Sequence, residues 1–286
     1  MSEPQRVPAA DIEPEAQRAT TSDWRTDPNF RMPERRPWSQ LGPDFIAAWG
    51  LSDPKDPQPE HVEIIGQNGS GKSYLMCTML QDRMKARKTG AVIICTKKAD
   101  RVFAKLGWPI VDTWDEVRQE TNCLYWPRTS RTGTARKQYH EAKVNDLLDH
   151  LWKEDANTIV AFDEIGYIES LSLETKNNVQ MYWREGRSLG ITVVGMKQRP
   201  QGALRDMHSE TYWTMAFKPK DRADLERWSE LFGAKRDWMP VFDDLNRERR
   251  EFIIANPVHD EAFISWVDVP LEPVRTPKRT PKWWRG

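Results

Sequence analysis

Cysteine is scarce in this chain of 286 residues, and long apolar runs are missing. The three cysteines, Cys77, Cys95 and Cys123, are odd in number and lack metal-ligand spacing, which argues against a disulfide framework and indicates buried thiols in a reduced compartment. The longest apolar stretches, 91–95 and 191–196, fall far short of the ~20 residues that span a bilayer. The N-terminus lacks the charged and then apolar pattern of a signal peptide. We therefore expect a cytoplasmic protein with no membrane contact.

Net charge is also absent, because 43 Lys and Arg residues balance 43 Asp and Glu residues. Contacts with nucleic acid must then come from local clusters of charge. Aliphatic residues are rare in segment 1–40, where proline and charged residues dominate, and this composition predicts a disordered or draped arm. Trp24, Phe30 and Trp38 are candidates to pin the arm to a surface; the alternative is a solvated tail with no role.

A glycine-rich loop follows a predicted buried strand, Val62–Ile65, and precedes a helix-forming run over 74–88. In such a setting the pattern G-x-x-x-x-G-K-[ST] forms a phosphate site from backbone N–H groups and a helix N-terminus. We predict an ATP site in which Lys72 reaches the β- and γ-phosphates and the Ser73 hydroxyl holds Mg²⁺. The alternative is a glycine-rich turn that caps an ordinary helix. The predicted nucleotide-binding residues are Gly66, Gln67, Asn68, Gly69, Ser70, Gly71, Lys72, Ser73 and Tyr74.

Two acidic residues end a second apolar strand, 158–162. In a parallel α/β sheet, ligands bind at the carboxyl ends of the strands, which is where Asp163 and Glu164 fall. We predict that Asp163 is the acidic partner of Ser73 in holding Mg²⁺, and that Glu164 polarises the water that attacks the γ-phosphate. A simple helix cap is the alternative for this acid pair.

Strand-like and helix-like segments alternate along the chain, which predicts a three-layer α/β fold with a mostly parallel central sheet. We expect strand 211–217 to close this sheet and strands 251–255 and 262–266 to form a C-terminal hairpin. The expected organisation is an arm over 1–40, an ATPase domain over 41–232, a hairpin extension over 233–270 and a basic tail over 271–286.

Positive charge is concentrated in two segments that contain no acidic residue, 128–137 and 275–285. We interpret the first as a flexible basic loop and the second as a tail that carries two adjacent tryptophans. Each is a candidate for contact with phosphate backbone or with a partner protein. A solvated loop and a disordered solubilising end are the respective alternatives.

Three segments together resemble the FtsK–HerA superfamily of ring-forming, DNA-translocating ATPases. They are the loop 66–73, the acid pair Asp163–Glu164, and segment 186–200, in which Gly-Arg-x-x-Gly-Ile precedes Lys197-Gln198-Arg199-Pro200. The family shows a strand that ends in T-Q-R-P, so Lys197 stands where threonine is usual. The resemblance covers residues 61–232, and only its last segment is specific to the family.

This resemblance implies a P-loop fold of the additional-strand, catalytic-glutamate type, with the Gln198 strand between the strands that end at the loop and at Asp163. It implies ATP hydrolysis that drives double-stranded DNA through a homo-pentameric or homo-hexameric ring. It also implies an arginine finger supplied across the subunit interface, by Arg187 or by Arg184 one turn earlier. Gln198 would contact the γ-phosphate or the attacking water. The alternative for Arg187 is a cation at a helix C-terminus.

The absence of the extra domains of larger family members favours the genome-packaging ATPases of small phages and membrane-containing viruses. Such a motor would work in the host cytoplasm and dock on a capsid portal protein. Two alternatives remain: a DNA-transfer, virion-assembly or secretion ATPase of a mobile element, and a small-molecule kinase. Glu164 argues against the kinase, because activated water competes with any other phosphate acceptor.

Overall fold

The computed structural model describes residues 30–50, 60–87, 89–153, 156–198, 208–232, 237–256 and 261–273. The expectations for the N-terminal arm before Phe30, for Arg199 and Pro200, and for the basic tail 275–285 lie outside these residues. Residues 30–32, the described part of the N-terminal unit, contain no helix or strand. The helices and strands below belong to the unit Pro33–Gly286.

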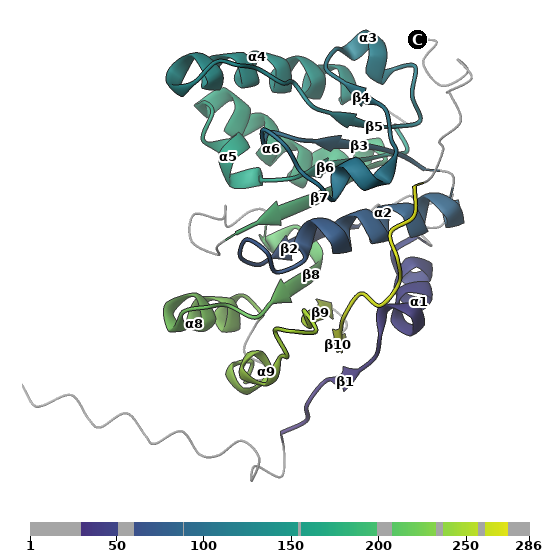
Figure 1. Cartoon of the computed structure of the whole chain (residues 1–286), viewed down its shortest axis with the longest axis vertical. Coiled ribbons are helices and arrows are strands. Elements are labelled where there is room, and N and C mark those ends of the chain that lie inside the picture. The colour runs from purple at the N-terminus through teal and green to yellow at the C-terminus, as the bar shows by residue number, and fades with distance from the viewer. Residues whose placement is uncertain are drawn as a thin grey trace, which may run out of the picture. The chain divides into compact units, whose positions relative to one another are not determined.

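Ten strands of the described residues form one mixed sheet (Figure 1). The strands between β8 and β4 pair in parallel, β9 pairs antiparallel with both its neighbours, and β1 pairs in parallel with β10. The expected mostly parallel α/β sheet is therefore confirmed. Across the sheet the order is β1 (Glu34–Arg35), β10 (Glu261–Ser265), β9 (Phe252–Asn256), β8 (Thr211–Phe217), β2 (His61–Ile65), β7 (Ile191–Lys197), β6 (Thr158–Phe162), β3 (Gly90–Ile94), β5 (Asn122–Tyr125) and β4 (Ile110–Val111).

Strand β7 lies between β2 and β6, as expected for the additional-strand type. Val194 pairs with Val62 on one side and with Ala161 on the other. All seven residues of β7 are buried, which fits a strand that is covered on both faces by helices. The additional strand predicted from the sequence is confirmed.

Strand β8 does not close the sheet, so that expectation is wrong. The antiparallel hairpin of β9 and β10 was predicted to within a residue, but β9 also pairs with β8, and Phe217 lies opposite Phe252. The physical reason is that every residue of β9 is buried, so β9 needs a covered position inside the sheet. The hairpin therefore extends the central sheet.

Helices cover both faces of the sheet and complete the three layers (Figure 1). One face packs against α1 (Trp38–Gly50), α2 (Lys72–Arg87) and the 3₁₀ helix η2 (Phe103–Leu106). The other face packs against α4 (Gly133–Leu151), α5 (Ile165–Glu169) and α6 (Leu173–Glu185). The remaining helical segments are α3 (Trp114–Val117), η3 (Gly186–Leu189), α8 (Arg222–Leu231) and α9 (Met239–Asp244).

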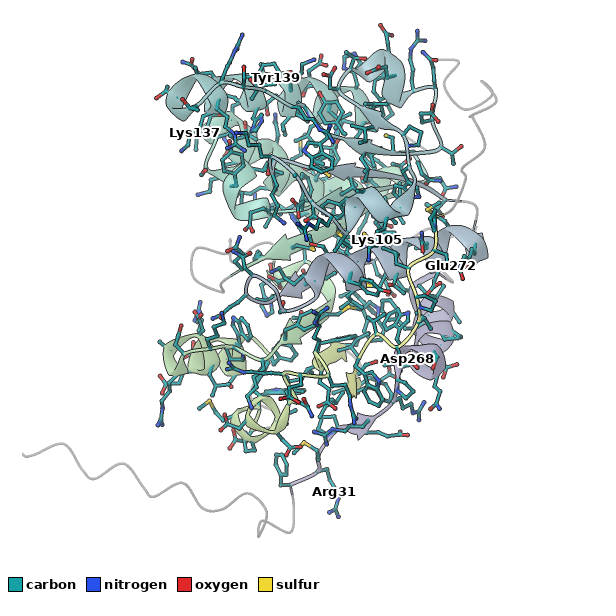
Figure 2. The ribbon with its side chains drawn as sticks, in the orientation of Figure 1. Arg31, Lys105, Lys137, Tyr139, Asp268 and Glu272 are labelled. Atoms are coloured by element: carbon teal, nitrogen blue, oxygen red, sulfur yellow. The ribbon has the colours of Figure 1, made fainter. Side chains whose placement is uncertain are left out.

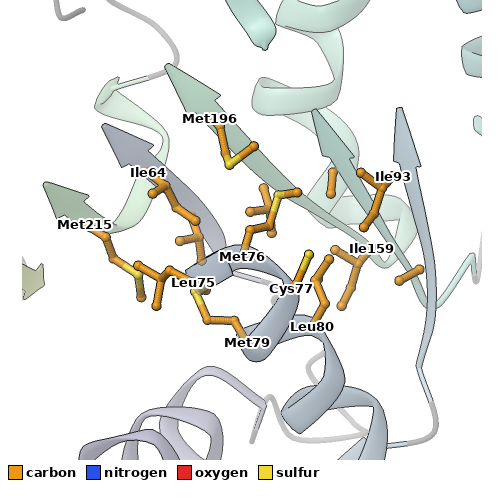
Figure 3. Close-up of a cluster of buried hydrophobic side chains, with 14 of the residues drawn as sticks. Ile64, Leu75, Met76, Cys77, Met79, Leu80, Ile93, Ile159, Met196 and Met215 are labelled. Atoms are coloured by element: carbon orange, nitrogen blue, oxygen red, sulfur yellow. The ribbon is translucent and has the colours of Figure 1, made fainter. Parts of the chain in front are cut away.

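Helix α2, which begins at the phosphate loop, rests on the sheet through a fully buried apolar face (Figure 3). Leu75, Met76 and Met79 of α2 meet Ile64 of β2 and Met215 of β8 in one core cluster. Alternate residues of each strand point to this face, so the cluster fixes the rotation of β2 and α2 together. The loop between them is consequently held at both ends.

Two helices begin earlier than expected. The disordered or draped arm was expected to reach residue 40, but α1 has 13 residues and begins at Trp38, which is 1% exposed. The basic segment 128–137 was interpreted as a loop, yet α4 begins at Gly133, so its second half is the first helical turn. Helix α1 begins at Trp38 because this side chain packs against apolar residues distant in the sequence. The Trp38 ring lies 6.3 Å from that of Phe252.

Replacement of Trp38 by alanine tests how firmly α1 is part of the core. The Trp38 ring packs on Phe45 at 5.6 Å, and its Nε1 donates a hydrogen bond to Asp82 at 3.1 Å. We expect Trp38→Ala to lower the free energy of unfolding by about 3–5 kcal/mol, because a large cavity would remain. Urea denaturation followed by circular dichroism measures this change. Leu173→Ala, at a residue 73% exposed, is the control and should change stability by less than about 0.5 kcal/mol. Equal effects would show that α1 is not part of the core.

Candidate active site

The phosphate loop connects the end of β2 to the start of α2, as the sequence predicts. Gly71 has a φ of +113°, a conformation open to glycine and strained for other residues. A Cβ on Gly66 would lie 2.9 Å from the Cβ of Phe217, so the loop passes too close to β8 for any side chain there. The backbone of the loop is thus held in the shape that the pattern requires.

Lys72 is 8% exposed, and its ammonium group donates to the carbonyl oxygens of Gly66 and Gln67, the latter at 3.1 Å. Burial lowers the pKa of Lys72 to about 8, while the charge of Glu164 opposes this effect. Ser73 lies in the first turn of α2 and is half-buried. The side-chain amide of Gln67 contacts Asp224 at 3.5 Å, which links the loop to the first turn of α8.

Asp163 and Glu164 directly follow β6 at the same edge of the sheet. Asp163 is 1% exposed, and its Oδ1 forms an ion pair with Lys97 at 2.7 Å. Burial raises the pKa of Asp163 to about 6, although Lys97 lowers it. The other oxygen, Oδ2, is buried and has no hydrogen-bond partner among the described residues. A buried carboxylate oxygen without a donor is suited to a cation, which fits the predicted role of Asp163 as a Mg²⁺ ligand.

Gln198, at the end of β7, donates a hydrogen bond from its Nε2 to Oε2 of Glu164 at 2.5 Å. Burial raises the pKa of Glu164, and the Gln198 contact and the charge of Lys72 act in the opposite direction. The structure therefore brings Lys72, Glu164 and Gln198 together, at the carboxyl ends of the three neighbouring strands β2, β6 and β7. This arrangement is able to hold a terminal phosphate on one side and a water molecule on the other.

Arg187 and Arg184 lie away from this edge. Arg187 belongs to η3, which precedes β7. It lies near His61, the first residue of β2. Burial is the main cause that lowers the pKa of the His61 imidazole, and the charge of Arg187 lowers it further. Since β2 has five residues, the strand separates Arg187 from the phosphate loop by roughly 17 Å. Arg184 is exposed in the last turn of α6. Neither arginine lies beside the phosphate loop of its own chain.

Lys97 was missed as a site residue from the sequence. It follows β3, and it also lies 3.5 Å from Asp100. The available signal was its position just beyond a predicted buried strand, where parallel sheets gather ligand-binding side chains. The contact of Lys97 with Asp163 could not be read from the sequence, because the two residues lie 66 positions apart.

A buried ionic cluster beneath the site was also missed. Glu63 of β2 is fully buried, pairs with Lys197 at 2.8 Å and contacts His208 at 3.1 Å. Although burial raises the pKa of Glu63, these two partners lower it to about 2. Lys197, which departs from the threonine of the resembled family, therefore neutralises a carboxylate on the adjacent strand.

The basic segment 128–137 rests on aromatic rings. Arg128 lies 4.7 Å from the ring centre of Trp126, and Arg131 lies 5.2 Å from that of Tyr139. Arg136 lies 5.8 Å from the Tyr167 ring and donates to the carbonyl oxygen of Thr96 at 2.7 Å. The segment follows β5, so it leaves the sheet at the same edge as the phosphate loop. Figure 2 labels Lys137 and Tyr139 at this end of α4.

Neither a metal site of another kind nor a membrane span is found in the described ranges. No group of three or more His, Cys, Asp or Glu residues gathers there as metal ligands. No helix among those residues is long and apolar enough to cross a bilayer. The cysteines of the described chain are free and buried, as predicted.

The fold is the P-loop NTPase fold with an additional strand. No protein-family model matches the sequence, and no curated protein matches it. Among solved structures, the chain is similar to the genome-packaging NTPase B204 from Sulfolobus turreted icosahedral virus 2, in complex with sulfate, at 14% identity and a TM-score of 0.56 over 73% of this chain and 97% of that one. It is similarly related to the DNA-packaging ATPase B204 from Sulfolobus turreted icosahedral virus, at 18% identity and a TM-score of 0.55 over 76% and 98% of the two chains.

The pH dependence of stability tests the environment of Glu169, which lies on α5. Its Oε1 atom is buried and has no hydrogen-bond partner among the described residues. Burial raises the pKa of Glu169 from its ordinary 4.5 to about 7, although Lys197 and Lys176 lower it. The folded state thus binds this proton more tightly than the unfolded state. The contribution of the Glu169 carboxyl to the free energy of unfolding is fully present below pH 4.5 and is lost as the pH rises through 7.

We therefore expect Glu169→Gln, which cannot ionise, to gain stability relative to the wild type between pH 4.5 and pH 8. Urea denaturation at a series of pH values measures the difference in free energy of unfolding. Glu185→Gln, which removes an exposed carboxylate at the end of α6, controls for a general change of surface charge. A difference between Glu169→Gln and the wild type that stays constant with pH would contradict the prediction.

Proposed function

We propose that this protein is an ATP-hydrolysing motor that moves double-stranded DNA through a homo-oligomeric ring and packages a viral genome into a capsid. The observation that carries the proposal is the contact between Gln198 and Glu164 beside Lys72, produced by the strand inserted between β2 and β6. The shared fold of the B204 packaging ATPases supports the biological role.

The residues of one chain divide the work of hydrolysis among them. Backbone N–H groups of the loop 66–73 and the N-terminus of α2 bind the phosphates, and Lys72 exchanges its loop carbonyls for phosphate oxygens. Ser73 and Asp163 would hold Mg²⁺, which would supply charge neutralisation at the phosphates. Glu164 orients and polarises the attacking water, while Gln198 fixes the position of the Glu164 carboxylate.

In the proposed ring, the arginines would act between subunits. Arg187 lies at the edge of the sheet opposite its own phosphate loop, which supports a role on the loop of a neighbouring copy. A cation that reaches the γ-phosphate from the neighbour would stabilise the transition state and couple hydrolysis around a pentamer or hexamer. Arg184, exposed one turn earlier, is the second candidate.

DNA and a capsid portal are the proposed partners of the ring. The basic segment 128–137 leaves the sheet at the catalytic edge, where a change at the phosphate site is able to alter its position. Its guanidinium groups lie on aromatic rings, which leaves their edges free to donate to backbone phosphates. The proposed place of action is the host cytoplasm.

Removal of the Glu164 carboxylate tests the proposed chemistry. We expect Glu164→Gln to lower kcat for ATP by at least about 100-fold while the Kd for ATP stays within a few-fold of the wild type, because general-base assistance is lost and the phosphate contacts remain. Release of inorganic phosphate and calorimetric titration measure the two quantities.

In the wild type, addition of duplex DNA should raise phosphate release. Turnover indifferent both to duplex DNA and to a portal protein would overturn the motor, and a phosphorylated metabolite in place of free phosphate would indicate a kinase.

Mixed rings test whether Arg187 acts between subunits. Arg187→Ala and Glu164→Gln should each be nearly inactive alone, yet their mixture should regain ATPase activity, because some interfaces then combine an intact Glu164 with a neighbour's intact Arg187. Titration of one variant into the other, followed by phosphate release, measures this recovery. The same mixture with Arg184→Ala is the matched comparison and identifies which arginine is the finger. An absence of recovery with both arginine variants would contradict a finger supplied by either residue.

A further inference from the structure

A pocket of about 490 Å³ lies beside the phosphate loop and is not used by the hydrolytic residues. Gly71 and Tyr74 form its loop side, and Phe217 at the end of β8 also lines it. Arg249, Arg250 and the C-terminal segment 267–270 form the remaining walls. Its volume lies in the range of pockets that hold small ligands.

The order of the strands decides which part of a nucleotide reaches this pocket. Lys72, Glu164 and Gln198 place the terminal phosphate toward β7 and β6. The phosphates follow the loop above β2, so the nucleoside must extend to the other side, toward β8 and β9. Phe217 ends β8 and Arg250 precedes β9, which puts the pocket on that side.

The C-terminal wall of the pocket is fixed by hydrogen bonds. The Tyr74 hydroxyl donates to the carbonyl oxygen of Val269 at 3.0 Å and accepts from the N–H of Leu271 at 2.8 Å. The Ser39 hydroxyl donates to Asp268 at 2.6 Å. In Figure 2, Asp268 and Glu272 mark this yellow segment, which passes α2 and α1. The wall is therefore held in place by the same helix that begins at the phosphate loop.

Arg250 stands at the rim of the pocket in a strained conformation. Its φ is +56°, in the left-handed region that disfavours a residue with a side chain. Its Cδ lies 3.5 Å from the position of a Cβ on Gly71, so its stem runs along the phosphate loop. The side chain is exposed, and among the described residues its guanidinium makes no hydrogen bond or ion pair. Strained residues that persist beside a ligand site point to a function of their side chain.

We propose that this pocket receives the base and ribose of the bound nucleoside triphosphate and that the planar guanidinium of Arg250 stacks on the base. The inference rests on the proposed ATPase function and deepens it by naming the residues that recognise the nucleoside. The buried Phe217 ring and Val267 supply an apolar floor, and Arg250 covers the outer face of the base through a cation–π contact.

Titration of the full chain with two ligands separates the pocket from the phosphate loop. ATP contains the base, whereas inorganic tripolyphosphate binds only the loop. We expect Arg250→Gly to raise the Kd for ATP about tenfold and to leave the Kd for tripolyphosphate unchanged. Arg250→Lys should behave in the same way, because lysine keeps the charge and loses the plane. Val267→Trp, which fills the pocket, should also weaken ATP alone.

Arg250→Gly is suited to this test because glycine removes the side chain and relieves the positive φ, so the melting temperature should not fall. Arg222→Ala, at an exposed arginine of α8 that pairs with Glu226, is the control and should change neither Kd. An equal rise of the Kd for ATP and for tripolyphosphate in Arg250→Gly would overturn the proposal. A wild-type Kd for ATP in Arg250→Lys would overturn it too, and so would a wild-type protein that binds both ligands with the same Kd. Failure of the ATPase proposal itself is distinct, since the wild type would then not turn over ATP.

Discussion

Hydrogen bonds that hold β7 between β2 and β6 are the constraint on which the rest of the structure depends. They align the ends of three parallel strands, so the loop, the acid pair and Gln198 meet at one edge. The N–H of Gly66 donates to the carbonyl oxygen of Lys197 at 3.0 Å, which ties the first residue of the loop to the inserted strand. Below that bond, Glu63 pairs with Lys197 inside the sheet. A slip of one residue would leave both charges buried and unpaired, so this pair favours a single register.

The site holds several charges in places that burial makes unfavourable. Lys72, Asp163 and Glu164 all have pKa values displaced toward their neutral forms, with burial as the largest cause. Partial compensation comes from the loop carbonyls, from Lys97 and from Gln198. In the proposed function, a nucleotide and its cation would take the place of these internal partners. Binding energy is thereby available from groups that the protein alone satisfies incompletely.

Helix α1 and the segment 266–272 both contact helix α2. Helix α1 comes before the phosphate loop in the sequence, and segment 266–272 comes almost 200 residues after Tyr74, yet both are bonded to α2 or to each other. The backbone N–H of Trp38 donates to the carbonyl oxygen of Trp266 at 2.9 Å. Helix α2, which carries Lys72, is therefore held by hydrogen bonds to α1 and to the segment 266–272. The pocket beside the phosphate loop forms because this C-terminal segment packs next to α2.

Local patterns in the sequence determined the phosphate loop, the acid pair and the parallel strands, because each depends on residues a few positions apart. The inserted strand also followed from the sequence, through a resemblance in segment 186–200. Tertiary structure alone decided that β8 is internal, that Lys97 faces Asp163, that Lys197 neutralises Glu63 and that Arg250 borders the loop. These contacts join residues from distant parts of the chain, and their free energy comes from burial and desolvation, which exist only after the sheet has assembled.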